Sequence, residues 1–236
     1  MEGIGLLAKV LWAPGEAMFL ISKRPRILAP LLLICMFSLL TAAAVLTKVD
    51  TGEMTLRQIE RSAQAGSMSE EAREQLKQQM NSPMMKGFTV ASTVAGPLAV
   101  IAMVSLVYFG IFTLLGRDAG FKAFFSVTSF AFVPGIFRQL AAVLTAFVVP
   151  SSDIMPDELG SLSPAVFLDR DAVSPVLFAG VNLIDLVSIW IMILLSIGFG
   201  FLARRSLSTG ARIAAVIGPF LLYAGLRLAL AALRGV

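Results

Sequence analysis

Three charged residues interrupt segments that are otherwise apolar, and their types and positions suggest chemistry. They are Arg138 in residues 123–149, Asp185 in residues 176–202 and Arg227 in residues 213–233. A charge near the bilayer centre costs about 2.5–3.5 kcal/mol on insertion scales, so such groups usually face one another. At about 1.5 Å per helical residue, all three lie within roughly 10 Å of the midplane, on one side of it. We therefore predict that they form one cluster.

The surroundings of Asp185 indicate what this cluster could do. Asn182 and Ser188 lie three residues either side of it, on the same helix face. A buried ion pair that only fixes helix register is the favoured interpretation. Two arginines around one carboxylate also leave a net positive charge that suits an anion or a lipid phosphate. Proton transport is the least favoured, because a carboxylate held by arginine carries protons poorly.

Familiar catalytic and metal-binding groups are scarce. The chain has 236 residues, no histidine and one cysteine, Cys35. These counts exclude histidine-based acid–base catalysis, an intrachain disulfide and the usual zinc and iron–sulfur sites. An intramembrane aspartyl protease needs two facing carboxylates, and the apolar segments hold only Asp185. We expect no enzyme, no cofactor and no metal site.

The composition is that of an integral membrane protein. Hydrophobic residues make up 57% of the chain and charged residues 14%, against about 25% charged in soluble domains. A helix needs about 20 mostly apolar residues to cross the hydrocarbon core. We predict an all-α, polytopic membrane helix bundle with five spans, at residues 27–47, 91–115, 123–149, 176–202 and 213–233. Pro134 should kink the third span near Phe130 or Ala131.

The chain divides into four parts around these spans. Residues 1–26 are predicted to form an N-terminal interfacial amphipathic helix with Trp12 at headgroup level, and a simple extension of the first span is the alternative. Residues 27–47 are the first span and residues 48–88 an extramembrane helical loop. Residues 89–236 hold the other four spans, with an acidic loop at 150–175 that is expected to be a solvated linker.

Two further patterns concern packing. In the loop 48–88, Ser67 and Glu70 fit a capping box, and Met68, Ala72, Leu76 and Met80 form a weak apolar stripe. This stripe is expected to lie on the protein's own membrane surface, with a partner's docking face as the alternative. Small residues in the spans allow helices to approach closely in lipid. They are Thr41, Ala42, Ala43, Ala44, Gly198, Gly200, Ala211, Ala214, Ala215 and Gly218.

Basic residues set the expected orientation. The net charge is +4, and Lys23-Arg24-Pro25-Arg26 directly precedes the first span. Lysines and arginines are also denser in the segments on the N-terminal side of the membrane, which favours a cytoplasmic N-terminus and an outside C-terminus. Their positions at span ends indicate orientation, not nucleic-acid binding.

Several short motifs occur in a characteristic order. Trp12, Pro14 and Phe19 precede the first span, and Trp190 lies in the fourth. Between them, Gly120-Phe-Lys122-Ala-Phe-Phe runs into Ala131-Phe-Val-Pro134. With the long polar insert and the closing helix pair, these motifs resemble the bacterial branch of the Yip1 family over nearly the whole chain. The family-motif positions are Pro14, Gly120, Lys122 and Pro134.

The resemblance implies five spans and a cytoplasmic N-terminus. Eukaryotic members act in vesicle trafficking and bind prenylated Rab-type GTPases, whereas bacterial members largely have no assigned function. The chain lacks the long N-terminal region of the eukaryotic members, and Ala95 precedes Gly96-Pro97 where the family has tyrosine. Binding of a small GTPase is therefore not carried over.

These observations predict a non-enzymatic, Yip1-like protein of a bacterial inner membrane that organises or assists a membrane-protein or lipid assembly. Its expected partners are membrane lipids and other membrane proteins or a second copy, and not nucleic acid. The alternative is a transport or permease-like component. It would use Arg138, Asp185, Arg227 and Asn182 as an intramembrane anion or lipid-headgroup site.

Overall fold

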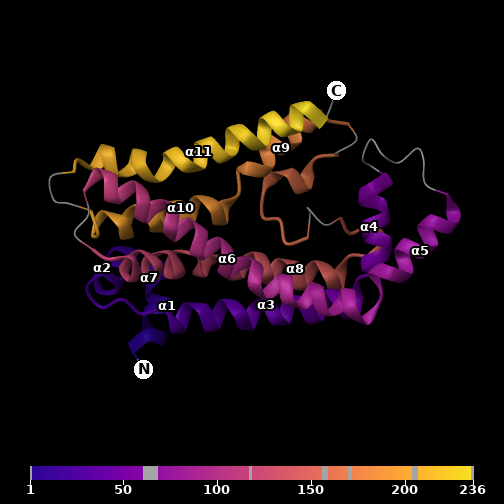
Figure 1. The fold of residues 1–236 in the computed structure, drawn as a ribbon, viewed down its shortest axis with the longest axis horizontal. Coiled ribbons are helices and arrows are strands. Elements are labelled where there is room, and N and C mark those ends of the chain that lie inside the picture. Colours follow the sequence, from indigo (N-terminus) through magenta and orange to yellow (C-terminus); the bar gives the residue numbers. More distant parts are fainter. Residues whose placement is uncertain are drawn as a thin grey trace. The chain divides into compact units, whose positions relative to one another are not determined.

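The computed structural model describes residues 2–60, 69–116, 119–155, 159–169, 172–203 and 207–234 (Figure 1). All regular elements within these residues are helices, as the composition predicts. The α-helices are α1 (Glu2–Trp12), α2 (Pro14–Lys23), α3 (Leu28–Lys48), α4 (Thr51–Glu60), α5 (Glu70–Met80), α6 (Pro83–Leu115), α7 (Phe121–Ala131), α8 (Ile136–Val148), α9 (Pro175–Leu183), α10 (Leu186–Gly200) and α11 (Thr209–Arg234). Short 3-10 helices are η2 (Val133–Gly135), η3 (Ser151–Asp153) and η4 (Pro164–Phe167).

The chain forms two compact units. Unit 1 comprises Met1–Ile34, Pro97–Gly135 and Ser163–Val236. Unit 2 comprises Cys35–Gly96 and Ile136–Leu162.

The described residues contain four or five candidate spans, where the sequence predicts five. Four helical segments are long and apolar enough to cross a membrane: Leu28–Lys48, Pro83–Leu115, Phe121–Val148 and Thr209–Leu233. The pair α9 and α10 makes a fifth candidate, but its two helices meet at an angle of 47°. The sequence predicts a continuous helix there, and the bend at Ile184 and Asp185 is the main departure from it.

The third span contains the predicted break. Pro134 has no backbone N–H and cannot continue the helical hydrogen-bond ladder. The helix α7 ends at Ala131, and Gly135 N–H instead donates to Phe132 O at 2.9 Å within η2. The chain becomes α-helical again at Ile136.

The N-terminal segment forms two helices, where the sequence predicts one. Pro14 occupies the first turn of α2, a position that tolerates proline, and the break falls at Ala13. Residues Ala17, Met18 and Ile21 of α2 are fully buried, so this helix is part of the core of unit 1. Because α2 ends at Lys23 and α3 begins at Leu28, the segment is not an extension of the first span.

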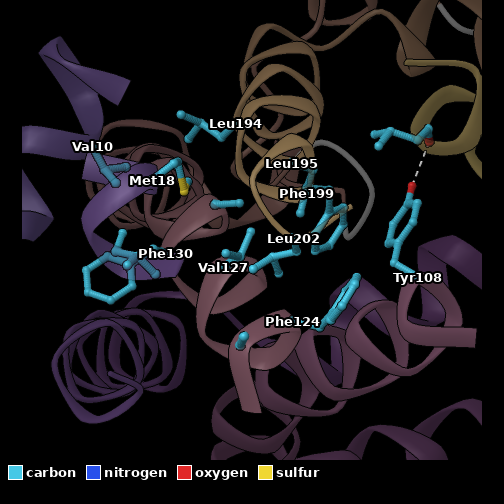
Figure 2. Packing of buried hydrophobic residues seen from close by; sticks show 14 of the residues in the cluster. Val10, Met18, Tyr108, Phe124, Val127, Phe130, Leu194, Leu195, Phe199 and Leu202 are labelled. Carbon is cyan, nitrogen blue, oxygen red and sulfur yellow. Dashed lines mark hydrogen bonds between the residues drawn. The ribbon is translucent and has the colours of Figure 1, made fainter. Parts of the chain in front are cut away.

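The core of unit 1 is built from aromatic rings and one close helix crossing (Figure 2). Phe199 of α10 stacks on Phe124 of α7 with ring centroids 5.2 Å apart. Gly198 makes this approach possible, because a Cβ there would lie 2.4 Å from Cγ1 of Val127. Met18 of α2 packs on the other side of the crossing, and its sulfur would lie 3.2 Å from the same Cβ.

In unit 2, α4 and α5 form a helical hairpin outside the predicted spans. Asp50 Oδ1 accepts hydrogen bonds from the N–H groups of Gly52 and Glu53 at 3.0 Å and from Asn81 Nδ2 at 3.1 Å. These bonds hold the start of α4 against the end of α5. The N-cap of α5 is Ser69, whose Oγ accepts from Ala72 N–H at 3.3 Å. The predicted cap, Ser67, and Met68 of the predicted stripe lie outside the described residues.

The acidic loop is not simply a solvated linker, because parts of it pack back onto the helices. Ile154 and Met155 are buried in unit 2, and Ser163 and Ala165 are buried in unit 1. Gly160 has a φ of +74° and lies so close to α8 that a Cβ would be 2.5 Å from Arg138 O. Apolar side chains in the loop are buried only because the loop folds back. The net acidity of the loop predicts a solvated linker and gives no sign of these buried residues.

Candidate functional site

The bend between α9 and α10 is the most polar feature of the predicted fourth span. Asp185 is 6% exposed and serves as the N-cap of α10, its Oδ2 accepting from Ser188 N–H at 3.0 Å. Aspartate is a favoured N-cap because its side chain satisfies an N–H that the first turn leaves unpaired. The charge predicted in the middle of a span therefore lies where two helices meet.

Asn182 lies one turn before the bend, at the end of α9. Its Oδ1 accepts a hydrogen bond from Ser163 Oγ at 2.9 Å. Ser163 is 3% exposed and is also the N-cap of η4, where its Oγ accepts from Ala165 N–H. The buried Ser163 hydroxyl thus connects the acidic loop to the end of α9, next to the bend. Asn182, Asp185 and Ser188 do not share one continuous helix face, since the helix changes direction between them.

The two predicted arginine partners of Asp185 have different surroundings. Arg227 on α11 is exposed, and its guanidinium carbon lies 5.9 Å from the centroid of the Tyr223 ring. Arg138 is half-buried on α8, in unit 2, whereas Asp185 and Arg227 belong to unit 1. A cluster of all three charges would join the two units and stays a prediction.

A polar group in unit 2, which the sequence reading did not single out, joins α3 to α8. Gln139 Nε2 donates to Ser38 Oγ at 3.2 Å, and Thr41 Oγ1 donates to the Gln139 carbonyl at 3.3 Å. Ser38 and Thr41 are nearly fully buried. Their three-residue spacing in an apolar helix is the signal that could have revealed this contact.

A second missed contact links α6 to α11 in unit 1. The Tyr108 hydroxyl donates to Val216 O at 2.7 Å (Figure 2). Val216 lies in the turn before Pro219, which has no N–H to donate to the carbonyl four residues earlier, that of Ala215, so the hydrogen-bond ladder of this turn is incomplete. A proline inside a span signals that carbonyls of the preceding turn accept bonds from elsewhere.

The outward surface of α11 carries small residues at regular spacing. Ala211, Gly218, Gly225 and Ala232 recur every seven residues and are all exposed. We call these four residues the α11 small-residue face. A Cβ placed on Gly218 or Gly225 would meet no atom within 4 Å. The described chain therefore does not use this face for its own packing.

The family-motif positions mark helix boundaries. Pro14 begins α2, and Gly120 is the N-cap of α7 with Lys122 in its first turn. Pro134 lies in η2, at the break of the third span. The two prolines and the glycine lie where helices start or stop, which is where these residue types are favoured.

The described residues contain no group of three or more His, Cys, Asp or Glu side chains suited to a metal ion. Helices long enough to cross a bilayer, a bent helix pair and wide apolar surfaces define the chain as a polytopic α-helical membrane protein. The Yip1 domain matches residues 8–230, nearly the whole chain, so the protein belongs to the Yip1 domain family. The bacterial branch stays a prediction. The chain has no match among curated proteins or among solved structures.

Proposed function

We propose that this protein is a non-enzymatic organiser of membrane-protein assemblies, and that α11 supplies the surface on which another transmembrane helix packs. The observation that carries the proposal is the α11 small-residue face. Only 6% of the apolar window of α11 is buried within the chain, against 39% for α3. Helices associate in lipid mainly through small residues that let backbones approach, so this face fits a second helix.

The exposed position of Arg227 is a separate feature of α11, because this residue lies about 160° around the helix from Gly225 and the small-residue face. An arginine on the outer surface of a span is costly in lipid, and no carboxylate of the described chain pairs with it. Arg227 lies seven residues before Arg234, or about 10 Å along the helix, so it can extend towards the headgroups.

Cysteine crosslinking in native membranes tests this proposal. In a Cys35→Ser background, Gly225→Cys places a thiol on the small-residue face, and Leu230→Cys places one on an exposed position about 140° around the helix. A maleimide that carries a photoreactive benzophenone should, on illumination, join Gly225→Cys to a second polypeptide, and Leu230→Cys should give little product. Equal yields from both positions, or none from either, would contradict the proposal.

The expected location is a bacterial inner membrane with a cytoplasmic N-terminus, which the basic residues before α3 support. In the same Cys35→Ser background, a membrane-impermeant maleimide applied to intact cells should label Glu71→Cys in the hairpin and leave Lys23→Cys unlabelled until the cells are opened. The reverse pattern would invert the proposed orientation.

A transport-like role is the second candidate, and the bend at Asp185 favours it. Interrupted helices with a buried charge are the usual construction of solute and ion sites in transporters. Purified protein in liposomes should then carry anionic solutes or lipids faster than empty liposomes, and Asp185→Asn should reduce that flux. A pure organiser gives no flux above background.

A further inference from the structure

A basic and aromatic surface lies at the C-terminal end of α2, in unit 1. Three large apolar side chains are exposed there: Phe19 at 45%, Leu20 at 42% and Phe201 at 46%. Lys23 and Arg24 beside them are also exposed. We call these five residues the α2 patch. Its mixture of rings and cations is typical of groups that lie at the level of lipid headgroups.

The patch is held in a fixed geometry. Residues Ala17, Met18 and Ile21 anchor the opposite face of α2 in the core, so Phe19, Leu20 and Lys23 must point away from it. The Phe19 ring meets Phe201 edge to face, with centroids 5.6 Å apart. Lys23 Nζ lies 5.7 Å from the centroid of Phe19. The two rings and the ammonium group thus form one continuous surface.

The charge of the patch is not neutralised within the described chain. Lys23 and Arg24 form no ion pair with any described carboxylate, whereas Lys9 on the neighbouring α1 is paired with Glu16. Arg212 adds a third cation, since its Nη1 donates to Gly200 O at 3.2 Å, directly before Phe201. An anion beside the rings would be attracted by all three.

The patch also lies where membrane helices begin and end. It comes four residues before the first residue of α3, Leu28, and it includes the residue that follows the end of α10. From these observations we propose that the α2 patch binds an anionic phospholipid. Lys23 and Arg24 would contact the phosphodiester, and Phe19, Leu20 and Phe201 would contact the upper acyl chains. A soluble anion would use the cations and leave the three apolar side chains in water.

Native mass spectrometry of the full chain in neutral detergent tests this proposal. The protein is titrated separately with phosphatidylglycerol and phosphatidylcholine. The anionic lipid should bind at least about tenfold more tightly, since each basic residue near the surface adds roughly a fivefold factor. The double variant Lys23→Gln/Arg24→Gln should bind phosphatidylglycerol roughly 30-fold more weakly and phosphatidylcholine unchanged. Equal affinities of the wild-type protein for the two lipids would overturn the proposal.

A matched control comes from unit 2. Lys48 Nζ lies 5.0 Å from the centroid of Phe147, which is 60% exposed, so it repeats the cation-over-ring contact without neighbouring cations on the same helix turn. Lys48→Gln should leave the affinity for phosphatidylglycerol within about twofold of wild type. A loss as large as that of the double variant would mean that net charge alone governs binding, and would overturn the site.

Two arms identify the ligand without relying on the charge variants. Phe19→Ser/Phe201→Ser should weaken binding of both lipids, because apolar contacts are shared by both. Inorganic phosphate should not displace phosphatidylglycerol at matched ionic strength. Displacement by phosphate, or unchanged lipid binding by the phenylalanine variant, would instead assign the patch to a soluble anion and overturn the lipid proposal.

Discussion

The hydroxyl of Tyr108 donates a 2.7 Å hydrogen bond to the main-chain carbonyl of Val216, and this bond joins α6 to α11 in unit 1. Both groups are buried, and the bond occurs one turn before the proline that interrupts the ladder of α11. It fixes the helix whose outward surface carries the small-residue face. The stability of α11 and the proposed function are therefore linked.

Removing this hydroxyl should loosen α11. Tyr108→Phe deletes the donor and leaves a buried carbonyl without that partner, so we expect a loss of about 0.5–1.5 kcal/mol in the free energy of unfolding. Unfolding in mixed micelles of increasing SDS content measures it. Tyr223→Phe is the control, since Tyr223 is 49% exposed and should lose little. Equal effects of the two variants would contradict the role of the buried bond.

The crossing at Gly198 should not tolerate a methyl group. Gly198→Ala would place Cβ 2.4 Å from Cγ1 of Val127, and such overpacking typically costs about 1–3 kcal/mol. Gly110→Ala on α6, where a Cβ meets no atom within 4 Å, should be neutral or slightly stabilising. In the double variant Gly198→Ala/Val127→Ala both γ-methyl groups of Val127 are removed, so the loss should be smaller than the sum of the losses of the two single variants. A loss equal to that sum would show that the crossing is not limited by Val127.

Asp185 should contribute both as a cap and as a charge. Asp185→Ala removes the cap and should cost about 0.5–2 kcal/mol or more. Asp185→Asn keeps a good cap and removes the charge, so any loss of folded yield in detergent reports the predicted pairing with arginine. We expect Asp185→Asn to lower this yield and Asp185→Asn/Arg138→Gln to recover part of it. If Asp185→Asn and Arg138→Gln each leave stability unchanged, the charges form no structural cluster.

The hairpin of α4 and α5 should weaken in acid. The N–H of Glu53 stabilises the Asp50 carboxylate and lowers its pKa below the usual 3.8, and Asn81 and Lys77 act in the same direction. A lowered pKa means that the stabilisation is complete above about pH 3.8, the unfolded value, and is lost as the pH falls through the lower folded value. The protection factors of α4 amides, which correct for the intrinsic pH dependence of hydrogen exchange, should fall across that window, and Asp50→Asn should abolish this fall. An Asp50→Asn variant with the wild-type pH profile would contradict this assignment.

Composition predicts the spans because burying a charge in lipid is costly. A long run without charges is therefore most stable inside the membrane. The break at Pro134 follows from the missing backbone N–H of proline. Pro14 lacks the same group and indicates the break at Ala13. The bend at Asp185 is different, because an aspartate in an apolar run fits a buried ion pair as well as a cap. The cap is recognised only once α10 is seen to begin at Leu186. The bond from Ser163 to Asn182 depends on a loop whose path no local pattern specifies.

Partner capture from native membranes tests the central claim most directly. Tagged wild-type protein and the variant Gly218→Leu/Gly225→Leu, whose new side chains meet no atom of the described chain near their Cβ positions, are purified in mild detergent after crosslinking. Quantitative mass spectrometry then compares the membrane proteins, including untagged copies of the chain, that accompany each. We predict that at least one partner falls about tenfold or more with the variant, as expected for losing a close helix contact worth about 1.4 kcal/mol. An unchanged set of partners in unchanged amounts would contradict the account.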